Sequence, residues 1–195
     1  MQTAHSPIFR DYLIRFQQTA IKETGRRPLS FLRMPMDEKL VLAGCKRPGY
    51  VFWQPIPWQD SQPPLGKHVS LFHQTIVDYL SFCQFLEIRF HLPVAPASSP
   101  LSFLYGRTFE TFKNTESATP AQAFEEAVFY SKNHPELPLS FSMASTCDDG
   151  VPLLILLRAE DGQAYIHQGD GSGEPLYLKL TVERLLPKLK FIYEF

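Results

Sequence analysis

The sequence predicts a single α+β domain in which helices pack on a mostly antiparallel or mixed sheet. The chain has 195 residues, 44% of them hydrophobic, which suffices for one substantial core but would be cramped for two. Segments with helical periodicity alternate along the chain with strand-like runs, and no internal repeat is evident. Seventeen prolines against ten glycines indicate many stiff connections and few long helices. We therefore treat residues 1–195 as one domain.

The N-terminal segment SPIFRDYLIRFQQTAIKETG has the clearest helical pattern. Ser6 is a suitable cap, Pro7 fits the first turn and Gly25 is a suitable terminator. One face of this helix is apolar and should pack on the rest of the protein. The residues of that face are Ile8, Phe9, Tyr12, Leu13, Phe16, Ala20 and Ile21.

The next hundred residues alternate in pattern. After a turn at RRPLS, the runs LVLAG and YVFWQP should pair as strands through a turn at residues 47–49. Residues 67–83 keep helical spacing, and FLEIRFH then alternates with the period of a strand. The run SFLYGRTFETF is strand-like but interrupted by Gly106. A helix beginning near Thr119 covers AQAFEEAVFYSK and should direct Phe124 and Val128 inward.

The C-terminal third predicts a strand meander. The strands LPLSFSMAS and VPLLILLR are joined by the acidic turn CDDG, and a turn at residues 160–162 leads into AYIHQ. GDGSGEP forms a loop, and LTVERLLPKL closes as a short helix that Pro187 kinks or confines. The expected order is helix, strands, helix, strands, helix, strand meander and helix.

Charge is unevenly distributed along the chain. The formal net charge of −1 disfavours a nucleic-acid binder that works by bulk electrostatics. Residues 1–97 nevertheless carry eleven basic and seven acidic residues, or +4, whereas residues 98–195 carry eight and thirteen, or −5. Such polarity suits a partner-binding surface. An accidental scatter of solvated charges is the alternative.

The cysteines and the apolar runs indicate the cellular compartment in which the protein works. Cys45, Cys83 and Cys147 are odd in number and widely spaced, which favours reduced thiols in a cytosolic protein. The N-terminal segment lacks the apolar run of a signal peptide, and no stretch approaches the roughly 18 apolar residues of a membrane span. We expect a soluble cytoplasmic protein.

Motifs for catalysis are missing from the sequence. The loop IHQGDGSGEP lacks the GK[ST] of a phosphate-binding loop, and the six histidines form neither HExxH nor a Cys/His cluster. We expect no enzymatic activity, no metal and no cofactor. The adjacent acids Asp148–Asp149 and Glu160–Asp161 lie at turns of the predicted meander, where they favour a docking patch over an active site.

The stretch FWQPIPW, following an amphipathic helix and RPLS, resembles the Syd family of bacterial SecY-interacting proteins. The order continues with LFHQTIVDYLSFCQF, AQAFEEAVFY, ELPLSFSMAS with its acidic turn, LLILLRAEDGQAYIHQ and LYLKLTVERLLPKL. The resemblance spans roughly residues 7–190. The aromatic-Trp-Gln-Pro element is moderately specific, and the other segments support it mainly through their order.

The resemblance implies a non-catalytic adaptor that binds cytoplasmic loops of SecY, peripheral on the cytoplasmic side of the inner membrane. It implies no nucleic acid as partner, and membrane association only through a protein partner. The residues that match the acidic positions of the family are Asp148 and Asp149, with Glu87 as a further candidate. The wider SUKH superfamily implies an alternative, an immunity protein that binds and neutralises a bacterial toxin.

The two tryptophans complete the set of candidate partner-binding residues. In one interpretation, Trp53, Gln54 and Pro55 form an aromatic lip beside the groove that holds the partner. In the other, Trp53 packs in the core, the prolines end the strand and Trp58 is the more exposed ring. Because successive residues of a strand alternate between its faces, Phe52 and Trp53 are both buried only where both faces are covered.

Overall fold

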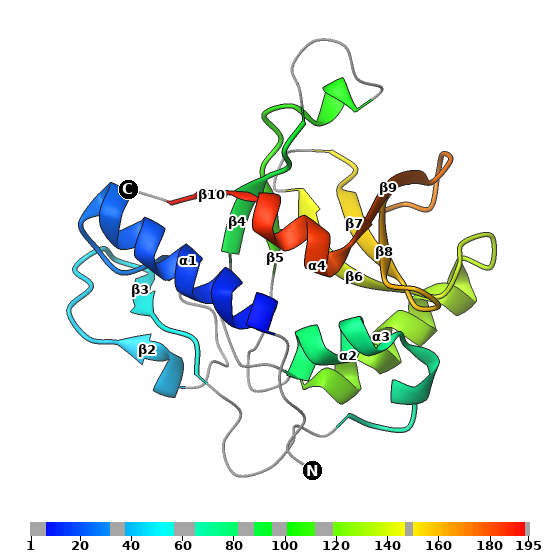
Figure 1. Cartoon of the computed structure of the whole chain (residues 1–195), viewed down its shortest axis with the longest axis horizontal. Coiled ribbons are helices and arrows are strands. Elements are labelled where there is room, and N and C mark those ends of the chain that lie inside the picture. Colours follow the sequence, from blue (N-terminus) through cyan, green and yellow to red (C-terminus); the bar gives the residue numbers. More distant parts are fainter. Residues whose placement is uncertain are drawn as a thin grey trace.

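The computed structural model of the chain describes residues 7–31, 38–56, 65–81, 88–94, 101–111, 119–146 and 150–193 (Figure 1). The helices in these ranges are α1 (Pro7–Thr24), α2 (Gln74–Ser81), α3 (Pro120–Asn133) and α4 (Val182–Leu185). Short 3-10 helices are η1 (Glu38–Leu40), η2 (Val69–Leu71), η3 (Ser102–Leu104) and η4 (Leu186–Lys188). The strands are β1 (Leu29–Phe31), β2 (Val41–Leu42), β3 (Tyr50–Trp53), β4 (Ile88–His91), β5 (Phe109–Thr111), β6 (Ser140–Thr146), β7 (Leu153–Arg158), β8 (Gln163–Gln168), β9 (Leu176–Thr181) and β10 (Lys190–Ile192).

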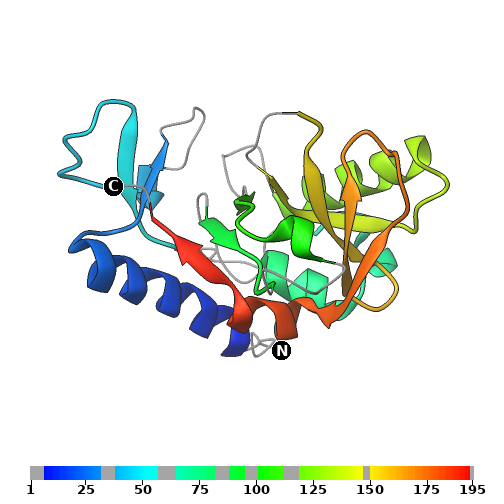
Figure 2. The same cartoon turned by 90° about the horizontal axis from the view of Figure 1, so that it is seen from above.

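The described strands form two sheets, and all of their pairings are antiparallel. Seven strands make a curled sheet in the order β10-β4-β5-β6-β7-β8-β9, and three make a small sheet in the order β1-β3-β2. Figure 2 shows the small sheet at one end of the molecule and β6–β9 at the other. The α+β domain predicted from the sequence is confirmed.

Helix α1 buries the apolar face that its sequence predicts. Phe9, Tyr12, Leu13, Phe16 and Ala20 are buried, and the helix ends where Gly25 adopts a φ of +68°. Two members of the predicted face lie at its border instead. Ile8 is half-buried, and Ile21 is 44% exposed. The predicted cap, Ser6, lies outside the described residues.

Phe16 connects α1 with both sheets. Its ring stacks on Trp53 of β3 with ring centres 5.6 Å apart, and it meets Phe191 of β10 edge-on at 5.1 Å. Its backbone carbonyl accepts a hydrogen bond of 2.8 Å from the buried hydroxyl of Tyr193. Arg15, the neighbouring residue, donates to the carbonyls of η4. The N-terminal helix and the C-terminal strand are therefore held together at one place.

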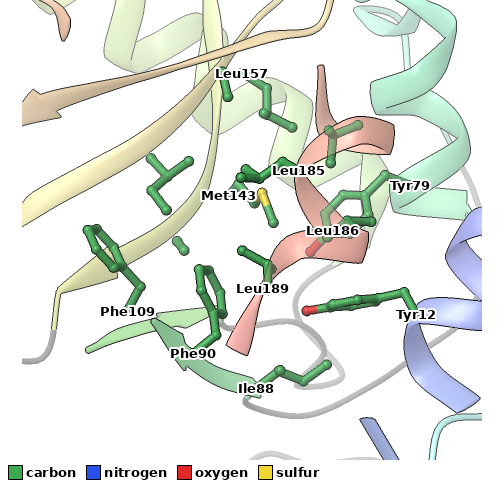
Figure 3. Packing of buried hydrophobic residues seen from close by; sticks show 14 of the residues in the cluster. Tyr12, Tyr79, Ile88, Phe90, Phe109, Met143, Leu157, Leu185, Leu186 and Leu189 are labelled. Carbon is green, nitrogen blue, oxygen red and sulfur yellow. The ribbon is translucent and has the colours of Figure 1, made fainter. Parts of the chain in front are cut away.

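The main core lies between one face of the large sheet and the helices, as Figure 3 shows. Strand residues point toward the turns of α4 and η4, and Tyr12 and Tyr79 enter from α1 and α2. The labelled members of this core are Ile88, Phe90, Phe109, Met143, Leu157, Leu185, Leu186 and Leu189. We call the face of β6–β8 that contributes to it the inner face, and the opposite face the outer face.

Several elements follow the sequence closely. The hairpin of β2 and β3 forms as predicted, and its turn is closed by a bond from the Tyr50 amide to the Arg47 carbonyl. Strand β4 alternates between buried Ile88 and Phe90 and half-buried Arg89 and His91. Strands β6, β7 and β8 form the predicted meander.

Three segments differ from the sequence prediction. Residues 67–81 form η2, an extended Phe72 and then α2, because the His73 amide bonds to the Ala159 carbonyl at 2.6 Å and so leaves the helical path. The first half of SFLYGRTFETF is the 3-10 helix η3, and only β5 is a strand. Strands β1, β9 and β10 were not predicted. Runs of three residues, as in β1 and β10, are too short to show a period, and the last two residues of β9 were assigned to the closing helix.

The first test concerns Phe16. We expect Phe16→Ala to lower the free energy of unfolding by about 3–5 kcal/mol, because it opens a cavity among Trp53, Phe191 and Tyr193. The control, Gln18→Ala on the exposed side of the same helix, should change it by less than about 0.5 kcal/mol. Urea unfolding followed by tryptophan fluorescence measures both. Similar losses in the two variants would contradict the role given to Phe16.

Candidate functional site

A groove runs between α3 and the outer face of β6 and β7. It has a volume of about 520 Å³, and its lining is mostly apolar. Figures 1 and 2 show α3 and α4 on opposite sides of these strands, so the groove lies away from the main core. We call it the α3 groove. It is lined by Ala123, Glu125, Glu126, Ala127, Phe129, Tyr130, Ser140, Phe141, Ser142, Leu154 and Leu156.

Local sequence fixes the start of α3. Thr119 and Gln122 form a reciprocal capping box, in which the Thr119 hydroxyl accepts from the Gln122 amide and the Gln122 side chain accepts from the Thr119 amide at 2.9 Å. Pro120 occupies the first turn, where its missing amide hydrogen costs nothing. One turn later, Phe124 packs fully buried on Phe72, with ring centres 4.6 Å apart. These contacts anchor the N-terminal half of the helix to the core.

The side of α3 that faces the sheet carries small residues. Ala123 and Ala127 are one turn apart, and Tyr130 follows three residues later on the same side. Because an alanine reaches only to its Cβ, the helix does not fill the space between itself and β7. The groove exists for this reason.

The floor of the groove comes from the outer face of the sheet. Leu154 is half-buried and Leu156 is buried, and Ser142 is exposed opposite Leu156. A β-bulge between Ser142 and Ala144 bends the strand at this point. The bend re-aims the side chains of β6 next to the groove.

One hydroxyl pair closes the floor. The Tyr165 hydroxyl donates to the Ser140 hydroxyl at 2.8 Å, and Ser140 donates in turn to the Pro138 carbonyl at 2.8 Å. Burial raises the pKa of Tyr165 to about 12. The Ser140 hydroxyl proton is therefore donated to a backbone carbonyl and not to a general base, so this serine is not arranged as an activated nucleophile.

The edge of the groove is acidic and aromatic. Glu125 and Glu126 are exposed on α3. Phe129, one turn further on, is 69% exposed, more than any other large hydrophobic side chain in the described part of the chain. An exposed phenylalanine beside an apolar floor enlarges the surface that a partner can cover.

At the C-terminal end of α3, ionisable side chains lie beside the groove. The His134 ring packs on Tyr130 with ring centres 4.3 Å apart, and its Nδ1 lies 3.3 Å from a carboxylate oxygen of Glu136. Burial raises the pKa of Tyr130, and the negative charges of Glu136 and Asp170 raise it further. This end of the groove therefore favours positive charge.

The residues predicted to bind a partner are only partly placed by the structure. Trp53 is fully buried under α1, so its ring belongs to the core, as the second interpretation of the tryptophans has it. Trp58, Glu87, Asp148 and Asp149 lie outside the described residues.

The described flanks show where the acidic turn is attached. Residues 147–149 connect β6 to β7, and the Leu153 amide donates to the Thr146 hydroxyl at 2.9 Å. The two strands that carry the turn are therefore the two that form the groove floor.

Sequence reasoning missed the α3 groove. Adjacent acids on a helix do not share a face, so Glu125 and Glu126 are unsuited to act as a catalytic pair, but this does not prevent them from forming the edge of a binding groove. The signal that was present is Phe129, which stands outside the inward-facing positions of its helix. An aromatic residue at a solvent position is a better indicator of a binding surface than a pair of acids.

Comparison with known proteins assigns no family to the chain. Neither the models of known protein families nor the curated proteins match it. Among the described residues, no helix has the length and apolarity to cross a bilayer, and no three His, Cys, Asp or Glu side chains gather as metal ligands. The described part of the chain holds one cysteine, Cys45, and it is a free thiol.

The second test concerns the hydroxyl pair. Folding raises the pKa of Tyr165 from 10 to about 12, so its neutral phenol stabilises the fold fully below pH 10 and this contribution is lost as the pH rises toward 12. We expect Tyr165→Phe to reduce the fall in unfolding free energy over that interval. At neutral pH the loss of the hydrogen bond should cost about 1 kcal/mol.

Urea unfolding at a series of pH values measures both effects. Tyr105→Phe, at a tyrosine that is 59% exposed, is the matched control and should behave as the unmodified protein. The slope that remains in Tyr165→Phe is expected from Tyr12, Tyr130 and Tyr193, whose pKa values are also raised by burial. A slope identical to that of the unmodified protein would contradict the assignment to Tyr165.

Proposed function

We propose that this protein is a non-catalytic adaptor that binds a basic cytoplasmic loop of SecY at the inner face of the bacterial inner membrane. The observation that carries the proposal is the α3 groove, in which an apolar floor is combined with an acidic edge on the outer face of β6 and β7. A loop that carries both apolar and basic side chains matches this combination.

The acidic residues come from two places that the fold connects. Glu125 and Glu126 lie on α3, and Asp148 and Asp149 are in the connection between the strands of the groove floor. The resemblance to the Syd family assigns partner binding to the acidic turn, and the groove extends that assignment to α3. Four carboxylates on neighbouring elements suit a positively charged segment.

Apolar contacts supply the part of the binding energy that charge does not. Charged pairs at the rim of an interface contribute little to affinity, whereas buried aromatic and aliphatic contacts dominate it. In this chain Phe129, Leu154 and Leu156 are the candidates for that role. The acidic residues then act mainly on the association rate and on the choice of partner.

The formal net charge of −1 limits long-range attraction. At physiological salt the screening length is about 8 Å, so only charges close to the groove guide an approaching loop. The proposal therefore predicts a salt dependence that follows the local acidic residues and not the whole molecule.

The third test concerns the acidic turn. We expect Asp148→Asn combined with Asp149→Asn to slow association with SecY in nanodiscs of zwitterionic lipid, and to reduce the salt dependence of the association rate. The free energy of unfolding should change by no more than about 0.5 kcal/mol if these side chains are exposed. Glu160→Gln, a neutralisation at the next turn of the meander, is the control. Equal rates and equal salt slopes for all three proteins would show that the two aspartates only shape their turn.

The fourth test concerns the apolar part of the groove. We expect Phe129→Ala to weaken SecY binding about tenfold or more through faster dissociation, as is typical when an aromatic anchor is removed. Phe103→Ala is the matched control, because Phe103 is also half-exposed but belongs to η3, outside the groove. Unchanged binding in both variants would place the SecY contact elsewhere. In that case the α3 groove loses its proposed role.

A further inference from the structure

Within the described residues, one face of the small sheet packs under α1 and the other is more open. Strand residues directly opposite each other share a face, and so do residues two apart along a strand. By the pairing of β1, β2 and β3, one face carries Ser30, Val41, Val51 and Trp53, which lie in or against the core under α1. The other face is apolar too. It carries Leu29, Phe31, Leu42, Tyr50 and Phe52, and we call it the aromatic face.

The aromatic face is exposed to different degrees along its length. Phe31 is 46% exposed, and the other four residues are half-buried. None of the five belongs to the main core or to the partly buried residues packed on it. Three aromatic rings on a sheet of three short strands form a large apolar surface for so small an element.

One basic residue, Arg47, lies directly on this face. Phe31 and Tyr50 pack edge to face, with ring centres 5.4 Å apart, and the Arg47 guanidinium lies 3.8 Å from the centre of the Tyr50 ring. The turn before Tyr50 comes close to the same rings. A Cβ placed on Gly49, whose φ is +75°, would lie 3.5 Å from the Phe31 ring.

The surrounding segment is strongly basic for this chain. Residues 26–56 contain six basic and two acidic residues, or +4, against −1 for the whole protein. Arg26, Arg27, Lys39, Lys46 and Arg47 are all exposed. They come from three separate stretches, after α1, in η1 and in the turn before β3, so the charge is spread over the end of the molecule that carries the small sheet (Figure 2).

We propose that the aromatic face binds an anionic membrane surface. Exposed aromatic rings beside Lys and Arg are the composition that settles at a lipid–water interface, where the rings reach the boundary of the acyl chains and the cations meet the phosphates. Cations spread over three segments suit a surface of many equivalent phosphates better than a few fixed carboxylates of a protein partner. The ligand class is therefore anionic phospholipid.

This inference replaces the expectation that the protein meets membranes only through a protein partner. That expectation came from the resemblance to the Syd family, which concerns a protein partner. Here the surface is a sheet face, and its residues come together only when β1, β2 and β3 pair. The inference does not depend on SecY, because it concerns lipid alone.

The test is cosedimentation of the full chain with vesicles that contain no protein. We expect binding to vesicles of phosphatidylglycerol and phosphatidylcholine in equal parts, and at least about tenfold weaker binding to phosphatidylcholine alone or in high salt. Lys46→Glu combined with Arg47→Glu should reduce the binding about tenfold or more. Phe31→Ser should reduce it without changing the net charge.

The control for charge is Lys132→Glu combined with Arg184→Glu, two exposed residues of α3 and α4 that undergo the same change of charge. It should retain most of the binding, and circular dichroism should show all variants folded. Equal losses in the two double variants would overturn the proposal, since they would reflect net charge alone. Failure of the unmodified protein to bind anionic vesicles would also overturn the proposal.

A poly-glutamate resin tests the alternative ligand. If the protein binds this resin and loses the binding in the Lys46/Arg47 variant, the face serves an acidic protein segment and the lipid proposal is wrong.

Failure here is distinguishable from failure of the proposed function. SecY binding is measured in nanodiscs of zwitterionic lipid, where the aromatic face has no anionic surface to contact. Vesicle binding is measured without SecY. Each result stands without the other.

Discussion

The packing of Phe16 against Trp53 and Tyr193 is the contact on which the rest of the structure depends. A sheet of three short strands is marginal by itself, and it becomes stable when one of its faces is buried. Helix α1 provides that burial, and the same phenylalanine meets the C-terminal strand of the large sheet. Two sheets whose strands do not pair in the described residues are thereby joined through one helix.

This constraint also decides which surfaces are left for binding. Because Trp53 is used to hold the small sheet on α1, the aromatic residues of the opposite face point away from that helix and lie outside the main core of the described residues. At the other end, α4 and η4 cover the inner face of the large sheet, and the outer face is left to α3. Helix α3 covers it incompletely because Ala123 and Ala127 are small. Both candidate surfaces are faces of sheets that the main core does not use.

Sequence reasoning succeeded where a signal is local. The four-residue spacing in α1, the start of α3 near Thr119 and the two-residue alternation in β4 can each be read within about a dozen residues. It failed where the structure depends on distant partners. Strand β10 pairs Lys190 with His91, 99 positions earlier in the chain, and α2 starts late because the His73 amide bonds to the Ala159 carbonyl. No local pattern contains these contacts.

The candidate site shows the same division between local and distant information. The sequence drew attention to Asp148 and Asp149 because two adjacent acids exceed what a turn needs. It did not show that α3 lies on the outer face of β6, which is what turns Phe129, Leu154 and Leu156 into neighbours of one groove. The face alternation of β3 was predictable, and it correctly allowed Trp53 to be buried. Which side of the small sheet α1 would cover was not predictable, and that choice makes the aromatic face.

Charge polarity links the two surfaces. The basic segment around the small sheet and the acidic edge of the α3 groove belong to opposite ends of the molecule (Figure 2). A partner in the groove and a lipid surface against the aromatic face therefore do not compete for the same residues. If both contacts form at once, the lipid contact holds the protein near the membrane and raises the effective concentration of the groove at any membrane-bound partner. Two individually weak contacts then suffice for stable association.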